Sequence, residues 1–166
     1  MSADVKETVC ADAASTAAVN ARKKGEWAAL RTELPIMAFD TVVGIGGRVL
    51  GKPKDRADAE RMFAELCGNT HEVVTAVYFR VGTKIIEKYE KTSVVFGAFD
   101  RETVYNYIDS GAPYDKAGGY SIEDAEISSL IVSVDGDRDN VAGLPVKLTE
   151  KLIEENLIYG ENGYRD

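Results

Sequence analysis

Histidine and cysteine are scarce in this chain of 166 residues, which has one histidine, His71, and two cysteines, Cys10 and Cys67. One imidazole excludes a metal site built from several histidines, and the two cysteines lack the paired spacing of a zinc site or a disulfide framework. No Gly-x-Ser-x-Gly sequence is present to supply a nucleophile for Ser-His-Asp chemistry. We therefore expect a protein of the reducing cytoplasm whose chemistry depends on other residue types.

Long apolar runs and long basic runs are also missing. No stretch is long enough to cross a bilayer, and the N-terminus lacks the basic and apolar regions of a secretion signal. The longest basic run is Arg22-Lys23-Lys24, and the formal net charge is -8. Because this charge repels the backbone of DNA or RNA, we expect neither a membrane nor a nucleic-acid polymer as a partner.

The chain does have enough apolar material for one core, since 45% of its residues are hydrophobic. We find no linker, internal repeat or low-complexity segment, so we predict a single domain over residues 1–166. A P-loop sequence is absent. The segment Gly44-Ile45-Gly46-Gly47-Arg48-Val49 begins like a dinucleotide-binding turn, but it has valine at the last glycine position and leads into strand residues. We interpret it as a hairpin.

Apolar spacing and turn residues predict helices that alternate with strands. The predicted helices run from a Ser15 or Thr16 cap to the Leu34-Pro35 dipeptide, over 55–66, from an Asp100 cap to Gly111, and from Pro145 through Ile153. The predicted strands cover 36–43, 49–50, 73–79, 85–96 and 127–134, with turns at Gly46-Gly47 and Gly82-Thr83. Because two hairpins interrupt the alternation, we expect an α/β fold in which helices flank a mixed, twisted sheet.

Asp40 lies in the middle of the apolar strand predicted over 36–43. An unpaired carboxylate in such a place costs on the order of several kcal/mol, so we expect a lysine or a metal ion as its partner. One interpretation is that Asp40 pairs with a lysine only to satisfy the sheet, because ion-pair networks also occupy such positions.

The other interpretation of Asp40 is a triphosphate site formed with Lys52, Asp115 and Lys116. Glycine or proline lies close to each of these three residues, so the chain leaves regular structure there and a ligand can approach the backbone. Carboxylates such as Asp40 and Asp115 hold a hard divalent cation, and ammonium groups neutralise phosphate oxygens. This set of residues predicts a site that handles phosphates with a metal ion.

A series of sequence blocks, in order and at workable spacing, covers most of the chain from Asp4 to Leu152. The blocks are Asp4-Val5-Lys6-Glu7, residues 21–24, Asp40-Thr41-Val42-Val43, Leu50-Gly51-Lys52-Pro53, Gly68 with His71 and Thr75, Thr92 with Phe96, residues 115–120, Asn140-Val141 and Gly143-Leu144-Pro145. Together they resemble the Maf family of nucleoside triphosphate pyrophosphatases, which carries a septum-formation name.

This resemblance implies a Maf or inosine triphosphatase-like fold, a homodimer, and hydrolysis between the α and β phosphates to the monophosphate and pyrophosphate, with Mg²⁺ or Mn²⁺ as the metal. The resemblance places Asp40 at the position of the family's proposed catalytic base. The substrate-binding positions of the family fall on Glu7, Lys24, Lys52, Asp115 and Lys116, and the positions linked to base choice fall on Thr41 and Glu123.

Two departures from the family pattern matter. Family members usually open with a strand and a Ser-x-Ser-Pro-Arg-Arg loop around the phosphates, which this sequence does not contain, so we expect that strand and phosphate loop to be missing and turnover to be reduced. Glu123 stands where the thymidine- and uridine-directed branch has glutamine, and an acid there resembles the branch acting on a methylated guanosine triphosphate.

We therefore expect a pyrophosphatase for dTTP, UTP or modified nucleotides. The alternative substrate is 7-methyl-GTP. The alternative function is that of a catalytically impaired Maf-like protein that binds nucleotides or acts as an interaction protein in cell division.

Overall fold

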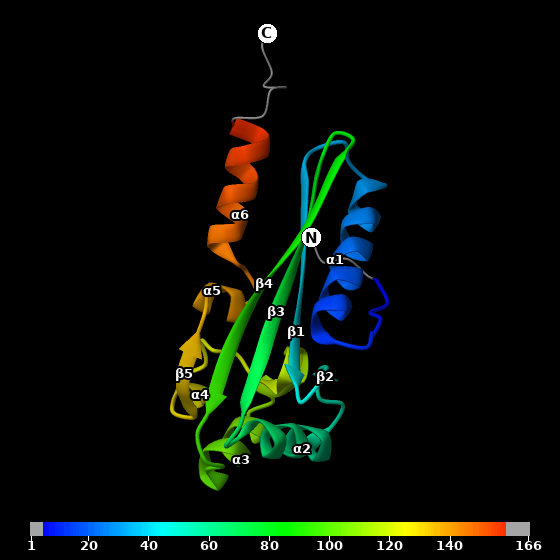
Figure 1. Ribbon diagram of the computed structural model, residues 1–166. Helices are drawn as coiled ribbons and strands as arrows, with labels where there is room; N and C mark the ends of the chain where they lie inside the picture. The colour runs from blue at the N-terminus through cyan, green and yellow to red at the C-terminus, as the bar shows by residue number, and fades with distance from the viewer. Residues whose placement is uncertain (1–4, 159–166) are drawn as a thin grey trace.

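The computed structural model describes residues 5–158, so Asp4 of the first sequence block lies outside the described residues. Within them, one sheet has the strand order β2-β1-β3-β4-β5 (Figure 1). Its strands are β1 Ile36–Ile45, β2 Arg48–Leu50, β3 Thr70–Val81, β4 Lys84–Phe96 and β5 Ile131–Asp135. The α-helices are α1 Ala13–Ala29, α2 Arg56–Leu66, α3 Arg101–Asp109, α4 Ala125–Ser128, α5 Arg138–Val141 and α6 Val146–Ile153. The 3₁₀ helices are η1 Ala112–Asp115 and η2 Ala117–Gly119, and a π-helical segment, η3 Glu154–Ile158, follows α6.

The α/β fold with helices flanking a sheet is confirmed, but the pairing differs from the mixed sheet that we expected. Every neighbouring pair among the described strands is antiparallel. Tight turns join β1 to β2 at Gly46-Gly47 and β3 to β4 at Gly82-Thr83, as predicted, and such turns reverse the chain direction. The return from β2 through α2 brings β3 alongside β1 in the opposite direction.

The prediction of a strand over 127–134 is wrong for the first half of that range. Residues Ala125–Ser128 form α4, and β5 begins only at Ile131. Ile127 and Leu130 lie three residues apart and both are buried in the core, which suits a helical turn better than a strand. The hydroxyls of Ser128 and Ser129 bond back to the carbonyls three residues earlier, so this segment's polar groups are satisfied locally.

The central strand β3 is covered on both faces. Val74, Ala76 and Tyr78 pack against α1, whereas Val77 and Phe79 pack with Leu152 of α6 on the opposite face. Figure 1 shows α1 and α6 on the two sides of the long strands, with α2 and α3 at the other end of the sheet. Burial on both faces explains why β3 is an almost unbroken apolar run rather than an alternating one.

Gly25 lies in the interior of α1, where the ring of Tyr78 on β3 packs directly against it. A Cβ atom at this position would lie 2.1 Å from Cδ1 and 2.7 Å from Cγ of Tyr78. Tyr78 is only 2% exposed, so its ring lies packed between the helix and the sheet. The close approach of α1 to the sheet therefore requires glycine, although glycine weakens a helix interior.

We expect Gly25→Ala to lower the free energy of unfolding by about 1–3 kcal/mol, the usual cost of overpacking a filled core. The same change in an exposed helix raises stability by about 0.5–1 kcal/mol, so the predicted sign is opposite to that of helix propensity. Urea unfolding measures the difference. Glu26→Ala, at the next and exposed position of α1, is the control and should stay within about 0.5 kcal/mol of wild type. A Gly25→Ala variant as stable as wild type would contradict this packing.

Candidate functional site

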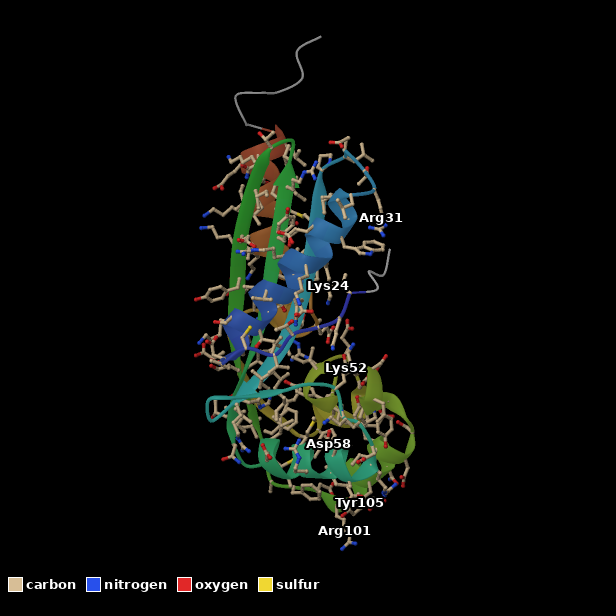
Figure 2. The ribbon with its side chains drawn as sticks, turned by 90° about the vertical axis from the view of Figure 1, so that its right-hand side faces the viewer. Lys24, Arg31, Lys52, Asp58, Arg101 and Tyr105 are labelled. Carbon is tan, nitrogen blue, oxygen red and sulfur yellow. The ribbon has the colours of Figure 1, made fainter. Side chains whose placement is uncertain are left out.

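A cavity of about 460 Å³ opens where the N-terminal segment, α1, β1, the loop after β2 and the η1–η2 region meet. Most of the site residues predicted from the sequence line it. They are Glu7, Lys24, Asp40, Thr41, Lys52, Asp115 and Lys116. Figure 2 shows Lys24 on α1 and Lys52 on the same side of the molecule, with the dark blue N-terminal segment running between them. Glu123 is exposed and does not line this cavity.

Asp40 projects from β1 toward α1 and is only 6% exposed. The ammonium group of Lys24 donates a hydrogen bond to its Oδ1, so the partner predicted for this carboxylate is a lysine of α1. Burial raises the pKa of Asp40 above its usual value, and the hydrogen bonds from Lys24 and Asn20 offset only part of this effect. Asp40 is thus a stronger proton acceptor, once ionised, than an exposed aspartate.

Glu7 connects the two lysines on either side of the N-terminal segment. Its Oε1 lies 3.6 Å from Nζ of Lys24 and 3.9 Å from Nζ of Lys52. Across the cavity, Nζ of Lys116 donates to Oδ1 of Asp115 at 2.8 Å. The hydrogen bond from Lys116 holds the pKa of Asp115 below its usual value, and the charges of Lys116 and Lys52 add to this. Acidic and basic groups therefore alternate along the cavity wall.

The loop of residues 115–120 is held against β1 by its glycines. Gly118 donates its N–H to the carbonyl of Gly51 at 2.9 Å, and a Cβ at Gly118 would lie 2.8 Å from Cγ2 of Val43. Gly118 also has a φ of 68°, which favours glycine. We expected these small residues to let a ligand approach, whereas their first effect is to let two loops pack closely. This packing brings Lys52 and Lys116 to one cavity.

Thr41 is fixed by a buried network on the other face of β1. Its Oγ1 lies 3.0 Å from Oγ1 of Thr75, which donates its own proton to the carbonyl of Asn140 at 3.0 Å. Because the Thr75 hydroxyl has a single proton, Thr41 is the donor in their shared bond. A Cβ at Gly143, which has a φ of 96°, would lie 3.2 Å from Oγ1 of Thr41. The backbone after α5 thus closes against this hydroxyl and leaves it acceptor capacity for the cavity.

Sequence reasoning assigned no role to two polar residues of this region, Asn20 and Asn140. Asn20 is 4% exposed, lines the cavity and lies one helical turn before Lys24. Asn140 is fully buried, and its Nδ2 donates to the carbonyl of Val73 and to Oγ1 of Thr92. An asparagine on the alanine-rich face of a helix was the available signal for Asn20, because a buried amide needs polar partners.

The carboxylates of the cavity fit a metal ion that is shared with a ligand. No group of three or more His, Cys, Asp or Glu side chains that could hold a metal is found between residues 5 and 158. Glu7, Asp40 and Asp115 nevertheless line one cavity. Mg²⁺ is commonly bound by one or two carboxylates together with waters and substrate phosphates. The donor set suits that arrangement rather than a cage formed by protein atoms alone.

None of the helices within residues 5–158 is long and apolar enough to span a bilayer.

Fold and cavity together define an α/β protein with paired carboxylates and ammonium groups around a space suited to a phosphate-bearing anion. A family model described as Maf-like protein matches residues 1–156. The chain belongs to the Maf family, as the sequence blocks predicted.

Curated relatives carry the name dTTP/UTP pyrophosphatase. The relative from Symbiobacterium thermophilum is 40% identical over 120 residues, which cover 72% of this chain and 61% of the relative. That from Pyrococcus furiosus is 44% identical over 119 residues, 72% of this chain and 62% of the relative. That from Chromobacterium violaceum is 35% identical over 161 residues, 92% of this chain and 81% of the relative. The chain thus spans about three-fifths of the length of the first two.

Proposed function

We propose that this protein is a nucleoside triphosphate pyrophosphatase that cleaves between the α and β phosphates and prefers dTTP and UTP. The observation that carries this proposal is the shared cavity of Asp40, Lys24, Lys52, Asp115 and Lys116. Membership in the Maf family and the names of its relatives support the same activity.

In this proposal the lysines bind the triphosphate and Asp40 acts as the general base. Lys24, Lys52 and Lys116 offset the negative charge of the triphosphate and the charge that builds on the leaving pyrophosphate. Asp40 accepts a proton from the attacking water, a task for which its raised pKa suits it. Lys24 keeps Asp40 oriented toward the cavity through their hydrogen bond.

We further propose that Asp40 and Asp115 hold Mg²⁺ or Mn²⁺ jointly with phosphate oxygens. The ion would polarise those oxygens and neutralise part of their charge. Pyrophosphate release should then stop in excess EDTA and return when Mg²⁺ or Mn²⁺ is restored, while urea unfolding shows that the protein stays folded throughout.

The hydrogen bonds of Thr41 support the pyrimidine preference. Thr41 donates its single hydroxyl proton to Thr75, so its Oγ1 can only accept hydrogen bonds from a ligand in the cavity. Thymine and uracil present an N3–H donor, whereas cytosine presents an acceptor at N3. We infer that dTTP and UTP are favoured over dCTP and CTP through this hydroxyl.

A pyrophosphate-release assay on dTTP, UTP, CTP and 7-methyl-GTP tests the function and the substrate separately. We expect release from dTTP and UTP with Mg²⁺ or Mn²⁺, and CTP to be at least about tenfold slower, the factor that one lost hydrogen bond to a buried site provides. A preference for 7-methyl-GTP would overturn the proposed preference for dTTP and UTP but would support the proposed reaction. No release above an Asp40→Asn control from any nucleotide would overturn the reaction.

The homodimer and the cytoplasmic location stay predictions. Light scattering of the purified chain would measure the mass of the assembly directly. Fractionation of cells that express the full protein would locate it, and both measurements are independent of the assay above.

A further inference from the structure

The N-terminal segment of residues 5–11 lies along one polar stripe of α1. Cys10 N–H donates to Oγ1 of Thr16 at 2.9 Å, Thr8 pairs with Asn20, and Glu7 pairs with Lys24. Thr16, Asn20 and Lys24 are spaced four residues apart, so they lie above one another on the helix. As the segment advances from residue 7 to residue 10, its partners on α1 move back toward the helix N-terminus. The segment therefore runs antiparallel to α1.

Asn20 makes the central connection in this arrangement. Its Oδ1 accepts the N–H of Thr8 at 2.8 Å, and its Nδ2 donates to the carbonyl of Thr8 at 3.1 Å. One carboxamide thus satisfies both backbone groups of one residue, as a neighbouring strand would. Among the described residues, no backbone-to-backbone hydrogen bond joins 5–11 to the sheet or to another loop. Side chains of α1 take the place of a strand partner here.

The residue next to Thr8 is Glu7, which stands between Lys24 and Lys52 at the cavity. Glu7 is half exposed, and its ion pairs of 3.6 and 3.9 Å are of the kind that contribute little to order. Asn20 is almost fully buried, and buried hydrogen bonds are costly to break. The position of Glu7 therefore depends more on the Asn20 amide than on the ion pairs of Glu7 itself.

We propose that Asn20 is a positioning residue of the active site, whose two bonds to the Thr8 backbone hold residues 5–11 on α1 and so place Glu7 between Lys24 and Lys52. This inference rests on the proposed function for its catalytic consequence. Asn20 acts through Glu7, whose carboxylate lies between the two ammonium groups of the cavity and sets the charge beside them. Misplacement of such groups by about 1 Å costs up to about a hundredfold in rate.

The structural half of this proposal is tested without substrate. We expect Asn20→Ala to speed amide hydrogen exchange at Thr8 by about tenfold or more, because the bond that protects this amide is removed. Amides of β3 should keep their wild-type rates, which separates local release of the segment from general loosening. Asn106→Ala, the same change at an exposed position of α3, is the matched control. Unchanged exchange at Thr8 in Asn20→Ala would overturn the proposal.

The catalytic half is tested by a double-mutant cycle on pyrophosphate release from dTTP. Asn20→Ala and Glu7→Gln should each lower kcat by about tenfold or more, and the double variant should be no slower than Glu7→Gln alone. A merely structural effect of Asn20, or a direct effect through its hydrogen bond to Asp40, would instead multiply with that of Glu7→Gln, and that outcome would overturn the proposal.

The two halves also separate this proposal from the proposed function. A wild-type protein that releases no pyrophosphate from any nucleotide would overturn the function and the catalytic consequence together. The exchange rate at Thr8 would still decide whether Asn20 places the segment.

Discussion

Asp40→Asn should lower pyrophosphate release from dTTP by about 10²- to 10⁴-fold, the range that a general base contributes. Asparagine keeps the size of the side chain and its bond to Lys24 through the amide oxygen, but it cannot take a proton from water. The drop should therefore appear in kcat. The measurement is initial rate against dTTP concentration, at one metal concentration for both proteins.

The fold should survive this substitution. Burial raises the pKa of Asp40, which means that the ionised carboxylate costs the folded state some stability despite its pairing with Lys24. Asparagine removes that cost, and Lys24 keeps a quarter of its side-chain surface in solvent and retains Glu7 nearby. We expect the free energy of unfolding at pH 7.5 to be equal to or higher than that of wild type.

The control for Asp40→Asn is Asp58→Asn. Asp58 pairs with Arg61 on α2, and Figure 2 shows it well below Lys24 and Lys52. Asp58→Asn is the same chemical change at a residue that does not line the cavity, so the activity of this variant should match that of wild type. Asp40→Asn activity within tenfold of wild type would favour the other interpretation of Asp40, in which the pair with Lys24 only satisfies the sheet.

Long elements could be predicted from the sequence because their patterns carry through many residues. α2 shows helical spacing in Ala59, Met62, Phe63 and Leu66, all buried as expected, and the hairpin glycines mark both tight turns. The segment around Ile127 failed because a short apolar run fits a strand and a buried helical turn equally well. Only its packing in the core, beside α3, decides between them.

Part of the site could be predicted because a charge inside an apolar strand demands a partner. Asp40 indicated the site for this reason, and the ammonium group of Lys24 is the partner that its carboxylate requires. Asn20 could not be found by the same rule, because its burial depends on how residues 5–11 fold back along α1, and this irregular segment has no periodicity. The resemblance to the Maf family matched Glu123 to a position linked to base choice, but the structure does not place Glu123 on the cavity wall. A match in sequence position therefore does not by itself locate a side chain at the site.

His71 is a core residue, although a lone histidine beside a helix C-terminus is more often a surface or capping residue. It is 2% exposed, with its ring edge-on to Phe96 and Tyr120 and its Nε2 2.6 Å from the Tyr120 hydroxyl. Burial lowers the pKa of His71 from 6.5 to about 4, because the core disfavours the charged imidazolium. The histidine is a core residue behind the cavity wall that Tyr120 helps to form.

A buried neutral histidine makes the fold sensitive to acid. Unfolded His71 takes up a proton near pH 6.5 and folded His71 only near pH 4, so the unfolded state binds more protons between these values. The stabilisation is complete above pH 6.5 and is lost as the pH falls toward 4. At about 1.4 kcal/mol for each pH unit, the free energy of unfolding should drop by about 2 kcal/mol between pH 7.5 and pH 5.

The variant that isolates this effect is His71→Gln, whose amide can still bond to the Tyr120 hydroxyl but does not titrate. Because His71 is the only histidine of the chain, the difference between the two proteins reports its titration alone. Asp40, whose raised pKa gives the opposite trend, contributes equally to both and cancels. Urea unfolding at pH 7.5 and pH 5 should show wild type losing about 2 kcal/mol more than His71→Gln. Equal losses in the two proteins would mean that His71 takes up its proton in the folded state as easily as in the unfolded chain.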